Sequence, residues 1–210
     1  YHKMRSALVY ESAIVICNQN MLVSHLMNQQ KGKGLFSPSV NTFIIDEAHN
    51  IESKFRDAYT TAYSKSDIVY IISESVKNIR NPILKSNAEE IIMELEELFR
   101  MFRIQVQKQE SKSEGDANSF FLEMNKDIKN KLIMIRRKLA SLNAITERDA
   151  GPVLQFLREA TNGLNENIVW LEKEKSLRLC VCQKDIRRDI SKLLFSQGRC
   201  TILTSATISD

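Results

Sequence analysis

Two short polar segments carry the residue types most suited to chemistry. The first, Asp46-Glu47-Ala48-His49, places two adjacent carboxylates and an imidazole within four residues. In such a pair Asp46 could hold Mg²⁺, mostly through its water shell, and Glu47 could orient and deprotonate a water that attacks a γ-phosphate. His49 could sense the state of the nucleotide and pass it to a neighbouring segment. The same residues also suit a strand end with solvated acids.

The second segment is Thr204-Ser205-Ala206-Thr207. Hydroxyl groups both donate and accept hydrogen bonds, so they could contact the acidic strand end and His49 if the two segments share one edge of a sheet. Taken alone, this segment is a polar turn.

Both segments directly follow short apolar runs, Thr42–Ile45 and Thr201–Leu203. Such runs are typical of strands buried in a parallel sheet, and the ligand sites of these sheets lie at the carboxyl ends of the strands. The same α/β pattern continues in a strand at Ala13–Cys17, a helix from Asn18 or Asn20 to Met27, a strand at Leu177–Cys182 and a helix at Asp185–Phe195.

The residues between these parts favour helices. Ser66 would cap a helix that ends at Asn81-Pro82, and Ser86-Asn87-Ala88-Glu89 fits a capping box for the next helix. The polar stretch 110–119 breaks that helix, and Gly151-Pro152 would start a last helical segment reaching toward Trp170. A helix seam against an antiparallel partner is predicted by the apolar residues Phe121, Ile128, Leu132, Ile135, Leu139 and Leu142.

We therefore expect an α/β fold with a large all-α insertion. Residues 1–59 and 173–210 would form two parts of one α/β domain, and residues 60–172 would form the inserted helical domain.

The composition excludes several classes of protein. With 43% apolar and 27% charged residues, the chain is neither disordered nor collagen-like, and 6 Gly with 3 Pro favour long helices. No apolar run approaches the length of a membrane helix, so we expect no membrane partner. A net charge of +4 permits nucleic-acid binding without requiring it. The spacing predicts buried thiols rather than metal ligands for Cys17, Cys180, Cys182 and Cys200.

The polar segments and their strands resemble a known family. F-I-I-D-E-A-H-N-I-E (43–52) and I-L-T-S-A-T-I-S (202–209) resemble motifs II and III of superfamily 2 DNA helicases. The closer resemblance is to the XPD/DinG-like branch, in which a helical arch domain lies between these motifs. I-V-I-C-N-Q-N-M-L (14–22) is similar to that branch's apolar strand, although Gln19 stands where many relatives carry His or Tyr.

This resemblance implies part of a RecA-like P-loop NTPase domain, together with an arch domain, from an ATP-dependent DNA helicase. Such an enzyme moves 5′→3′ on single-stranded or forked DNA, in DNA repair or replication, in the bacterial cytoplasm at the nucleoid. ATP and Mg²⁺ would be its cofactors. Asp46 would serve Mg²⁺ and Glu47 the attacking water, while His49, Ser205 and Thr207 would couple hydrolysis to strand movement.

No G-x-x-x-x-G-K-[ST] phosphate loop occurs in the sequence. We therefore expect a helicase fragment that runs from after the phosphate loop to motif III and is inactive alone. An iron–sulfur cluster, which relatives often carry, would lie before Tyr1 and not within the chain. Two alternatives remain: a DNA-dependent ATPase or translocase without unwinding, and, for the chain alone, a non-catalytic module that binds DNA or a protein partner.

A basic cluster between residues 126 and 138 could neutralise the phosphates of single-stranded DNA. It also suits the solvated face of the helix whose other face is the seam. Phe120 and Phe121 could stack on bases, although Phe121 falls on the seam. The members of the basic cluster are Lys126, Lys129, Lys131, Arg136, Arg137 and Lys138.

Overall fold

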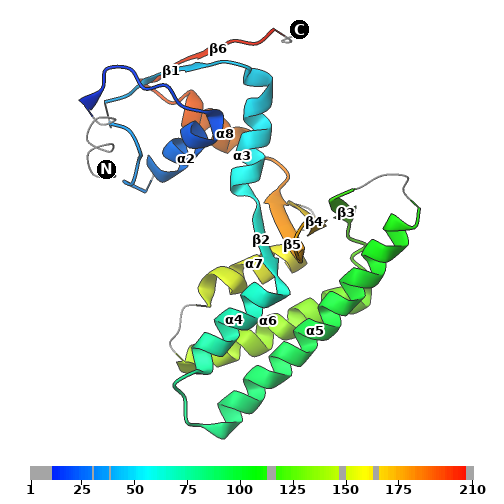
Figure 1. The fold of residues 1–210 in the computed structure, drawn as a ribbon. Helices are drawn as coiled ribbons and strands as arrows, with labels where there is room; N and C mark the ends of the chain where they lie inside the picture. Colours follow the sequence, from blue (N-terminus) through cyan, green and yellow to red (C-terminus); the bar gives the residue numbers. More distant parts are fainter. Residues whose placement is uncertain are drawn as a thin grey trace. The chain divides into compact units, whose positions relative to one another are not determined.

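The computed structural model describes residues 11–29, 31–37, 39–112, 117–146, 150–162 and 166–206. The chain is mixed α/β and divides into two compact units (Figure 1). Unit 1 comprises Tyr1–Tyr59 and Asp185–Asp210, and unit 2 comprises Thr60–Lys184. Within the described residues, no helix is both long enough and apolar enough to cross a membrane.

Unit 1 is built on two parallel strands, β1 (Thr42–Ile45) and β6 (Cys200–Leu203). The inner face of β1, formed by Phe43 and Ile45, packs on α2 (Gln19–Gln29), α3 (Ile51–Tyr59) and α8 (Arg187–Leu194). A short 3-10 helix, η1 (Ala48–Asn50), joins β1 to α3. The core of this unit consists of Leu22, Val23, Leu26, Phe43, Ile45, Ala48, Ile51, Phe55, Ile186, Leu193 and Leu194.

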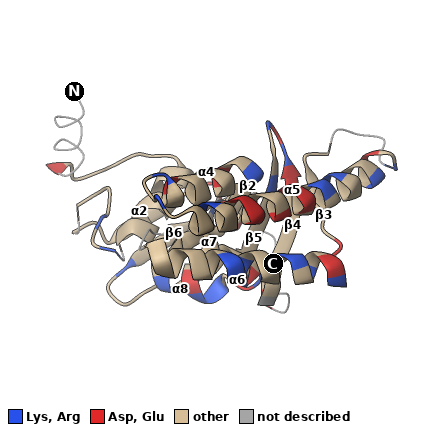
Figure 2. Cartoon of the chain, turned by 90° about the horizontal axis from the view of Figure 1, so that it is seen from below, with Lys and Arg blue, Asp and Glu red and all other residues tan. Residues whose placement is uncertain are grey.

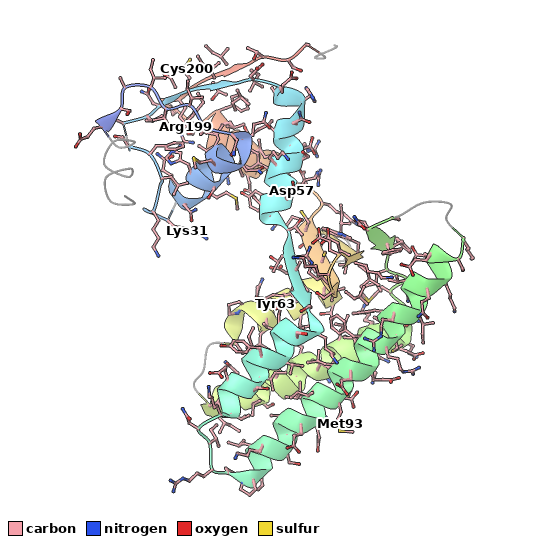
Figure 3. The ribbon with its side chains drawn as sticks, viewed as in Figure 1. Lys31, Asp57, Tyr63, Met93, Arg199 and Cys200 are labelled. Carbon is pink, nitrogen blue, oxygen red and sulfur yellow. The ribbon has the colours of Figure 1, made fainter. Side chains whose placement is uncertain are left out.

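Local contacts explain how these elements begin. The Asn18 Oδ1 atom accepts a hydrogen bond from the Met21 N–H at 2.9 Å, so Asn18 caps α2, one of the two caps that the sequence offered. Arg199, labelled in Figure 3, donates to Gln29 Oε1 at 2.6 Å, and its guanidinium lies 5.7 Å from the centre of the Phe43 ring. These contacts attach the start of β6 to α2 and β1.

The strand expected at residues 13–17 is wrong. These residues have no strand assignment, and Ile14 and Ile16 are 81% and 95% exposed. A strand needs a neighbour for its backbone hydrogen bonds, and no described strand pairs with this segment. The apolar run alone could not reveal that.

Unit 2 contains an antiparallel sheet in the order β2-β5-β4-β3. The strands are β2 (Thr61–Ser64), β3 (Ser119–Phe121), β4 (Asn167–Lys173) and β5 (Leu177–Gln183). Its helices are α4 (Lys65–Val76), α5 (Pro82–Glu110), α6 (Lys126–Thr146) and α7 (Gly151–Asn162). The segment between the two polar motifs is therefore not all-α.

The strand at Leu177–Gln183 was expected to belong to the returning parallel sheet, and that expectation is wrong. It pairs antiparallel with β2 on one side and β4 on the other, within unit 2. Leu179 to Cys182 are all buried, so this central strand is covered on both faces. A continuous apolar run marks such a strand whatever the direction of its neighbours. The same pairing turns Asn167–Lys173, which includes Trp170, into a strand instead of a helical segment.

In the helices of unit 2 the predicted apolar seam agrees with the structure, whereas the predicted caps do not. Ile128, Leu132, Ile135, Leu139 and Leu142 are at most 2% exposed on α6, which confirms the seam from Ile128 onward. Ser64, not Ser66, caps α4 through a capping box with Asp67. Asn81-Pro82 does not end a helix but starts α5, because Asn81 Oδ1 accepts the Ile83 N–H and proline suits the first helical position.

Phe120 and Phe121 lie on β3 rather than on the helix seam. Successive residues of a strand face opposite sides, so Phe120 is buried at 4% exposure and Phe121 is 72% exposed. The expectation that Phe121 is a core residue is therefore wrong.

The four cysteines are free thiols that differ in burial. Cys180 and Cys182 are buried as expected, and burial raises the pKa of Cys180 to about 12. Cys17 is half-buried, and burial raises the pKa of its thiol too. Cys200 is exposed, contrary to expectation, at the start of β6.

Candidate functional site

The two polar segments meet at one edge of the unit 1 sheet. In the parallel register Ile45 lies opposite Leu203, so Asp46 and Thr204 are the next residues on their two strands. The backbone continues the pairing beyond the strands: the Thr204 N–H donates to Ile45 O, and the Ala48 N–H donates to Thr204 O, each at 2.9 Å. The expectation that both segments follow neighbouring strands is confirmed.

Asp46 is held by two donors. Its Oδ1 atom accepts the Thr204 hydroxyl at 2.8 Å and the Glu47 N–H at 2.9 Å. These hydrogen bonds, that of Thr204 foremost, lower the pKa of the Asp46 carboxyl below its usual range. The exposed Asp46 side chain is therefore ionised at neutral pH, as a cation ligand must be.

His49 contacts both polar segments. Its Nδ1 atom lies 2.8 Å from Ser205 Oγ and 3.3 Å from Glu47 Oε2, and the His49 and Glu47 side chains are 42% and 55% exposed. The expected contacts of the hydroxyl residues with the acidic strand end and with His49 are thus both present. Ala206 is exposed beside them, and Thr207 lies outside the described residues.

Glu47 adopts a left-handed backbone conformation, with φ 50° and ψ 47°. Among the described residues it is the only one other than glycine with a positive φ. This conformation is unfavourable for a residue with a Cβ atom, and such strain is concentrated at functional sites. The turn between β1 and η1 therefore shows strain at the residue for which the sequence suggested a role in hydrolysis.

Gln19 is a residue of this site that sequence reasoning did not place there. Its Nε2 atom donates to Asp46 O at 2.7 Å and to Glu47 O at 3.1 Å. The one signal in the sequence was its departure from the residue types of the helicases that the sequence resembles. Nothing in that departure indicated which atoms Gln19 would contact.

The donor set of this edge fits magnesium. Mg²⁺ is usually bound by one or two carboxylates, with waters and phosphate oxygens as its other ligands, and Asp46 and Glu47 are exposed carboxylates in adjacent positions. Within the part of the chain that the structure describes, no three or more His, Cys, Asp or Glu side chains gather to hold a metal ion. A site enclosed by protein ligands is therefore not found among those residues.

The basic cluster on α6 divides into two groups. Lys131 pairs with Glu94 at 2.6 Å and Lys138 with Glu90 at 3.1 Å, so these two lysines join α6 to α5. Figure 2 shows where charged residues lie along the helices, with Lys and Arg in blue and Asp and Glu in red. The remaining members have no ion-pair partner among the described residues, and all but the half-buried Arg136 are exposed. This second group consists of Lys126, Lys129, Arg136 and Arg137.

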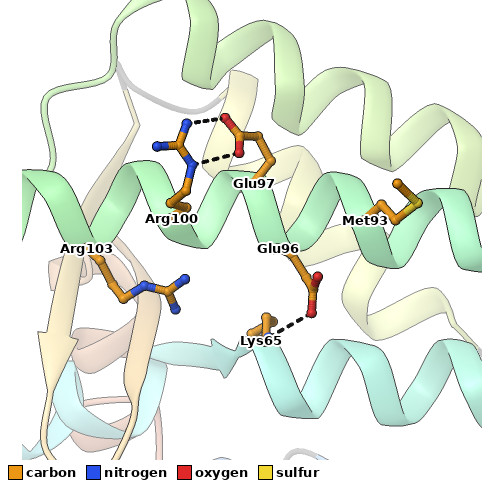
Figure 4. A pocket seen from close by; sticks show the side chains of 6 residues that line it. All are labelled: Lys65, Met93, Glu96, Glu97, Arg100 and Arg103. Atoms are coloured by element: carbon orange, nitrogen blue, oxygen red, sulfur yellow. Dashed lines mark hydrogen bonds and ion pairs between the residues drawn. The ribbon is translucent and has the colours of Figure 1, made fainter.

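A shallow pocket on unit 2 has a volume of about 430 Å³ (Figure 4). Its charges largely satisfy one another, because Lys65 pairs with Glu96 at 3.1 Å and Arg100 with Glu97 at 2.6 Å. It contains none of the candidate site residues. The pocket is lined by Lys65, Met93, Glu96, Glu97, Arg100 and Arg103.

In comparisons with known proteins, no protein-family model matches the chain, and no curated protein matches its sequence.

Proposed function

We propose that the chain is part of an ATP-dependent DNA helicase of the XPD/DinG type. In this proposal unit 1 is part of a RecA-like domain, and unit 2 is the domain inserted between motifs II and III. The observation that carries the proposal is the hydrogen bond from Thr204 to Asp46, together with the contact between His49 and Ser205. These contacts join the two motif segments across the 154 intervening residues 50–203, as coupling between hydrolysis and movement requires.

The residues would divide the work as follows. Asp46, ionised and fixed by Thr204, would hold Mg²⁺ beside the phosphates of ATP, and the metal would offset charge on those phosphates. Glu47 would orient the attacking water and accept its proton. His49, in contact with Glu47 and Ser205, would transmit a change at the nucleotide to the segment after β6.

The hydrolytic role of Glu47 can be tested in a protein that carries this chain together with a phosphate loop. Glu47→Gln should abolish DNA-stimulated ATP hydrolysis while nucleotide binding, measured by equilibrium titration, is retained. Glu52→Gln is the matched control, because Glu52 is a nearby exposed carboxylate that pairs with Arg56 on the surface of α3. Turnover by the Glu47→Gln protein at the wild-type rate would rule out this role.

Unwinding requires its own assay. A strand-displacement measurement on forked DNA separates a helicase from an ATPase or translocase that does not unwind. Hydrolysis stimulated by DNA without strand displacement would support the second candidate, and the roles of Asp46 and Glu47 would be unchanged.

We also propose that DNA contacts the second group of basic residues on α6, which have no ion-pair partner among the described residues. Replacing Lys126, Lys129 and Arg137 by Ala should weaken binding of single-stranded DNA and lower the salt dependence of log K by about 2, at about 0.7 per phosphate contact. Replacing Lys131 and Lys138 by Ala is the matched control, because Glu94 and Glu90 already offset their charges. Equal effects of the two sets would contradict a specific DNA contact.

A further inference from the structure

Gln19 connects α2 to the turn that carries the candidate site. It is the first residue of α2, directly after the Asn18 cap, and α2 is anchored in the unit 1 core by Leu22 and Leu26. From this fixed base the Gln19 amide reaches the turn that follows β1, 27 and 28 residues further along the chain.

The two carbonyl groups that Gln19 contacts are those on either side of the Glu47 Cα atom. The carbonyl of Asp46 belongs to the peptide unit before this atom, and the carbonyl of Glu47 to the unit after it. Rotation of these two units defines φ and ψ of Glu47. One amide nitrogen, 2.7 Å and 3.1 Å from the two oxygens, therefore restrains both torsions of the strained residue.

The orientation of the amide follows from the same contacts. With the amide reversed, its oxygen would face two carbonyl oxygens, which only accept hydrogen bonds. In the observed orientation Gln19 Oε1 is buried and has no hydrogen-bond partner among the described residues. The side chain thus makes both contacts to the turn but leaves its own acceptor unsatisfied. An unsatisfied buried acceptor lowers stability, so stability by itself does not explain this arrangement.

We propose that Gln19 is a positioning residue that keeps Glu47 in its left-handed conformation and so aims the Glu47 carboxylate. Two other contacts hold the turn from the side of β6 and Asp46: the Ala48 N–H on Thr204 O and the Glu47 N–H on Asp46 Oδ1. Gln19 restrains the turn from the side of α2. The effect on hydrolysis rests on the proposed function, whereas the effect on the turn does not.

The effect on the turn is measured on the chain itself by amide hydrogen exchange, resolved by NMR. Gln19→Met keeps the length of the side chain and removes its donors, so exchange of the buried Ala48 N–H should become about tenfold faster, from the loss of hydrogen bonding to the turn. The Leu26 amide in the core of α2 should keep its protection, which shows that the unit remains folded. Asn20→Ala, at the neighbouring exposed position, should change neither amide.

The effect on reaction is measured in a protein that also carries a phosphate loop. Gln19→Met should lower kcat for ATP at least tenfold with KM unchanged, because the Glu47 side chain loses its aim while nucleotide contacts remain. Gln19→Glu, whose carboxylate cannot donate at neutral pH, should behave in the same way. A change in KM with kcat retained would overturn the role in aiming Glu47.

The two measurements separate the two proposals. Unchanged exchange of the Ala48 amide in the Gln19→Met chain overturns the positioning role, whatever the activity. Absence of ATP hydrolysis in the wild-type protein with its phosphate loop overturns the proposed function, and the exchange result alone then decides whether Gln19 holds the turn.

Discussion

Glu47 occupies a backbone conformation that glycine adopts more easily than any residue with a Cβ atom. Replacing Glu47 by Gly should therefore stabilise unit 1 relative to Glu47→Ala. Both variants lose the carboxylate and its contact with His49, so that loss cancels in the comparison. The left-handed conformation costs alanine about 1–2 kcal/mol, and glycine loses about 0.4–1 kcal/mol more backbone freedom on folding. The glycine variant should be more stable by about 0.5–1 kcal/mol.

The assay must report on unit 1 alone. Trp170, the one tryptophan of the chain, lies on β4 in unit 2, so its fluorescence follows the other unit. Exchange of the buried amides of Leu22 and Phe55 against increasing urea gives the free energy of opening of unit 1. The Glu47→Gly chain should need more urea than the Glu47→Ala chain.

For a matched pair of variants at Glu52, the order of stability of the Gly and Ala variants should be reversed. Glu52 lies in the first turn of α3, where glycine is less favourable than alanine, so Glu52→Gly should be less stable than Glu52→Ala. The opposite order at the two positions would assign the effect to the Glu47 backbone rather than to glycine in general. If the Glu47→Gly chain is no more stable than the Glu47→Ala chain, the backbone of Glu47 is not strained.

Three further outcomes test other parts of the fold. His25 is buried, and its Nδ1 atom accepts the N–H groups of Leu35 and Phe36. Burial, and then the charge of the nearby Arg199, lower the pKa of His25. Unit 1 should therefore lose stability as the pH falls below the ordinary histidine pKa of about 6.5, by up to about 1.4 kcal/mol per pH unit. Amide exchange between about pH 8 and pH 5 measures this loss, and His25→Gln should reduce the dependence of stability on pH. Asn81→Ala removes the cap of α5 and should destabilise unit 2 by about 1 kcal/mol in urea titrations followed by Trp170 fluorescence, whereas Asn78→Ala in the exposed turn before it should not. Lys131→Glu should lower the stability of unit 2 by about 1 kcal/mol in the same titration, and adding Glu94→Lys should recover most of the loss, because the half-buried pair is restored with its charges exchanged.

Each of these outcomes has a result that would contradict it. Stability of unit 1 that does not change between pH 8 and pH 5 would contradict the neutral, acceptor role of His25. Equal midpoints for Asn81→Ala and Asn78→Ala would show that the cap of α5 contributes nothing. Additive losses in the double variant of Lys131 and Glu94 would show that the two side chains do not interact.

The meeting of Asp46 with Thr204 could be predicted from the sequence because two independent signals agree there. A short apolar run precedes each residue, and parallel strands bring their carboxyl ends to one edge. The α6 seam could be predicted for a similar reason, since the apolar residues from Ile128 to Leu142 follow at alternating steps of four and three residues, twice over. A prediction that rests on several residues at once, as these two do, does not depend on any single residue.

The sheet of unit 2 could not be predicted because its signals are short or ambiguous. β2 and β3 have 4 and 3 residues, too few for an alternating pattern to stand out. Thr61 pairs with Val181, far along the chain, and nothing local at either residue specifies that partner. The apolar run of β5 indicated a buried strand correctly and left open the direction of its neighbours.

The contacts of Gln19 were beyond any pattern, for a different physical reason. Hydrophobic periodicity reports burial that many residues share, whereas the position of the Glu47 backbone depends on one amide reaching two carbonyls from another element. A single polar contact of this kind contributes little to folding, so it does not shape the surrounding sequence. It can nevertheless decide where a carboxylate points, and a small error in that direction reduces a reaction rate strongly. Under the proposed function, a contact of this kind would affect the reaction rate although the sequence pattern gives no sign of it, and variants of Gln19 measure that effect.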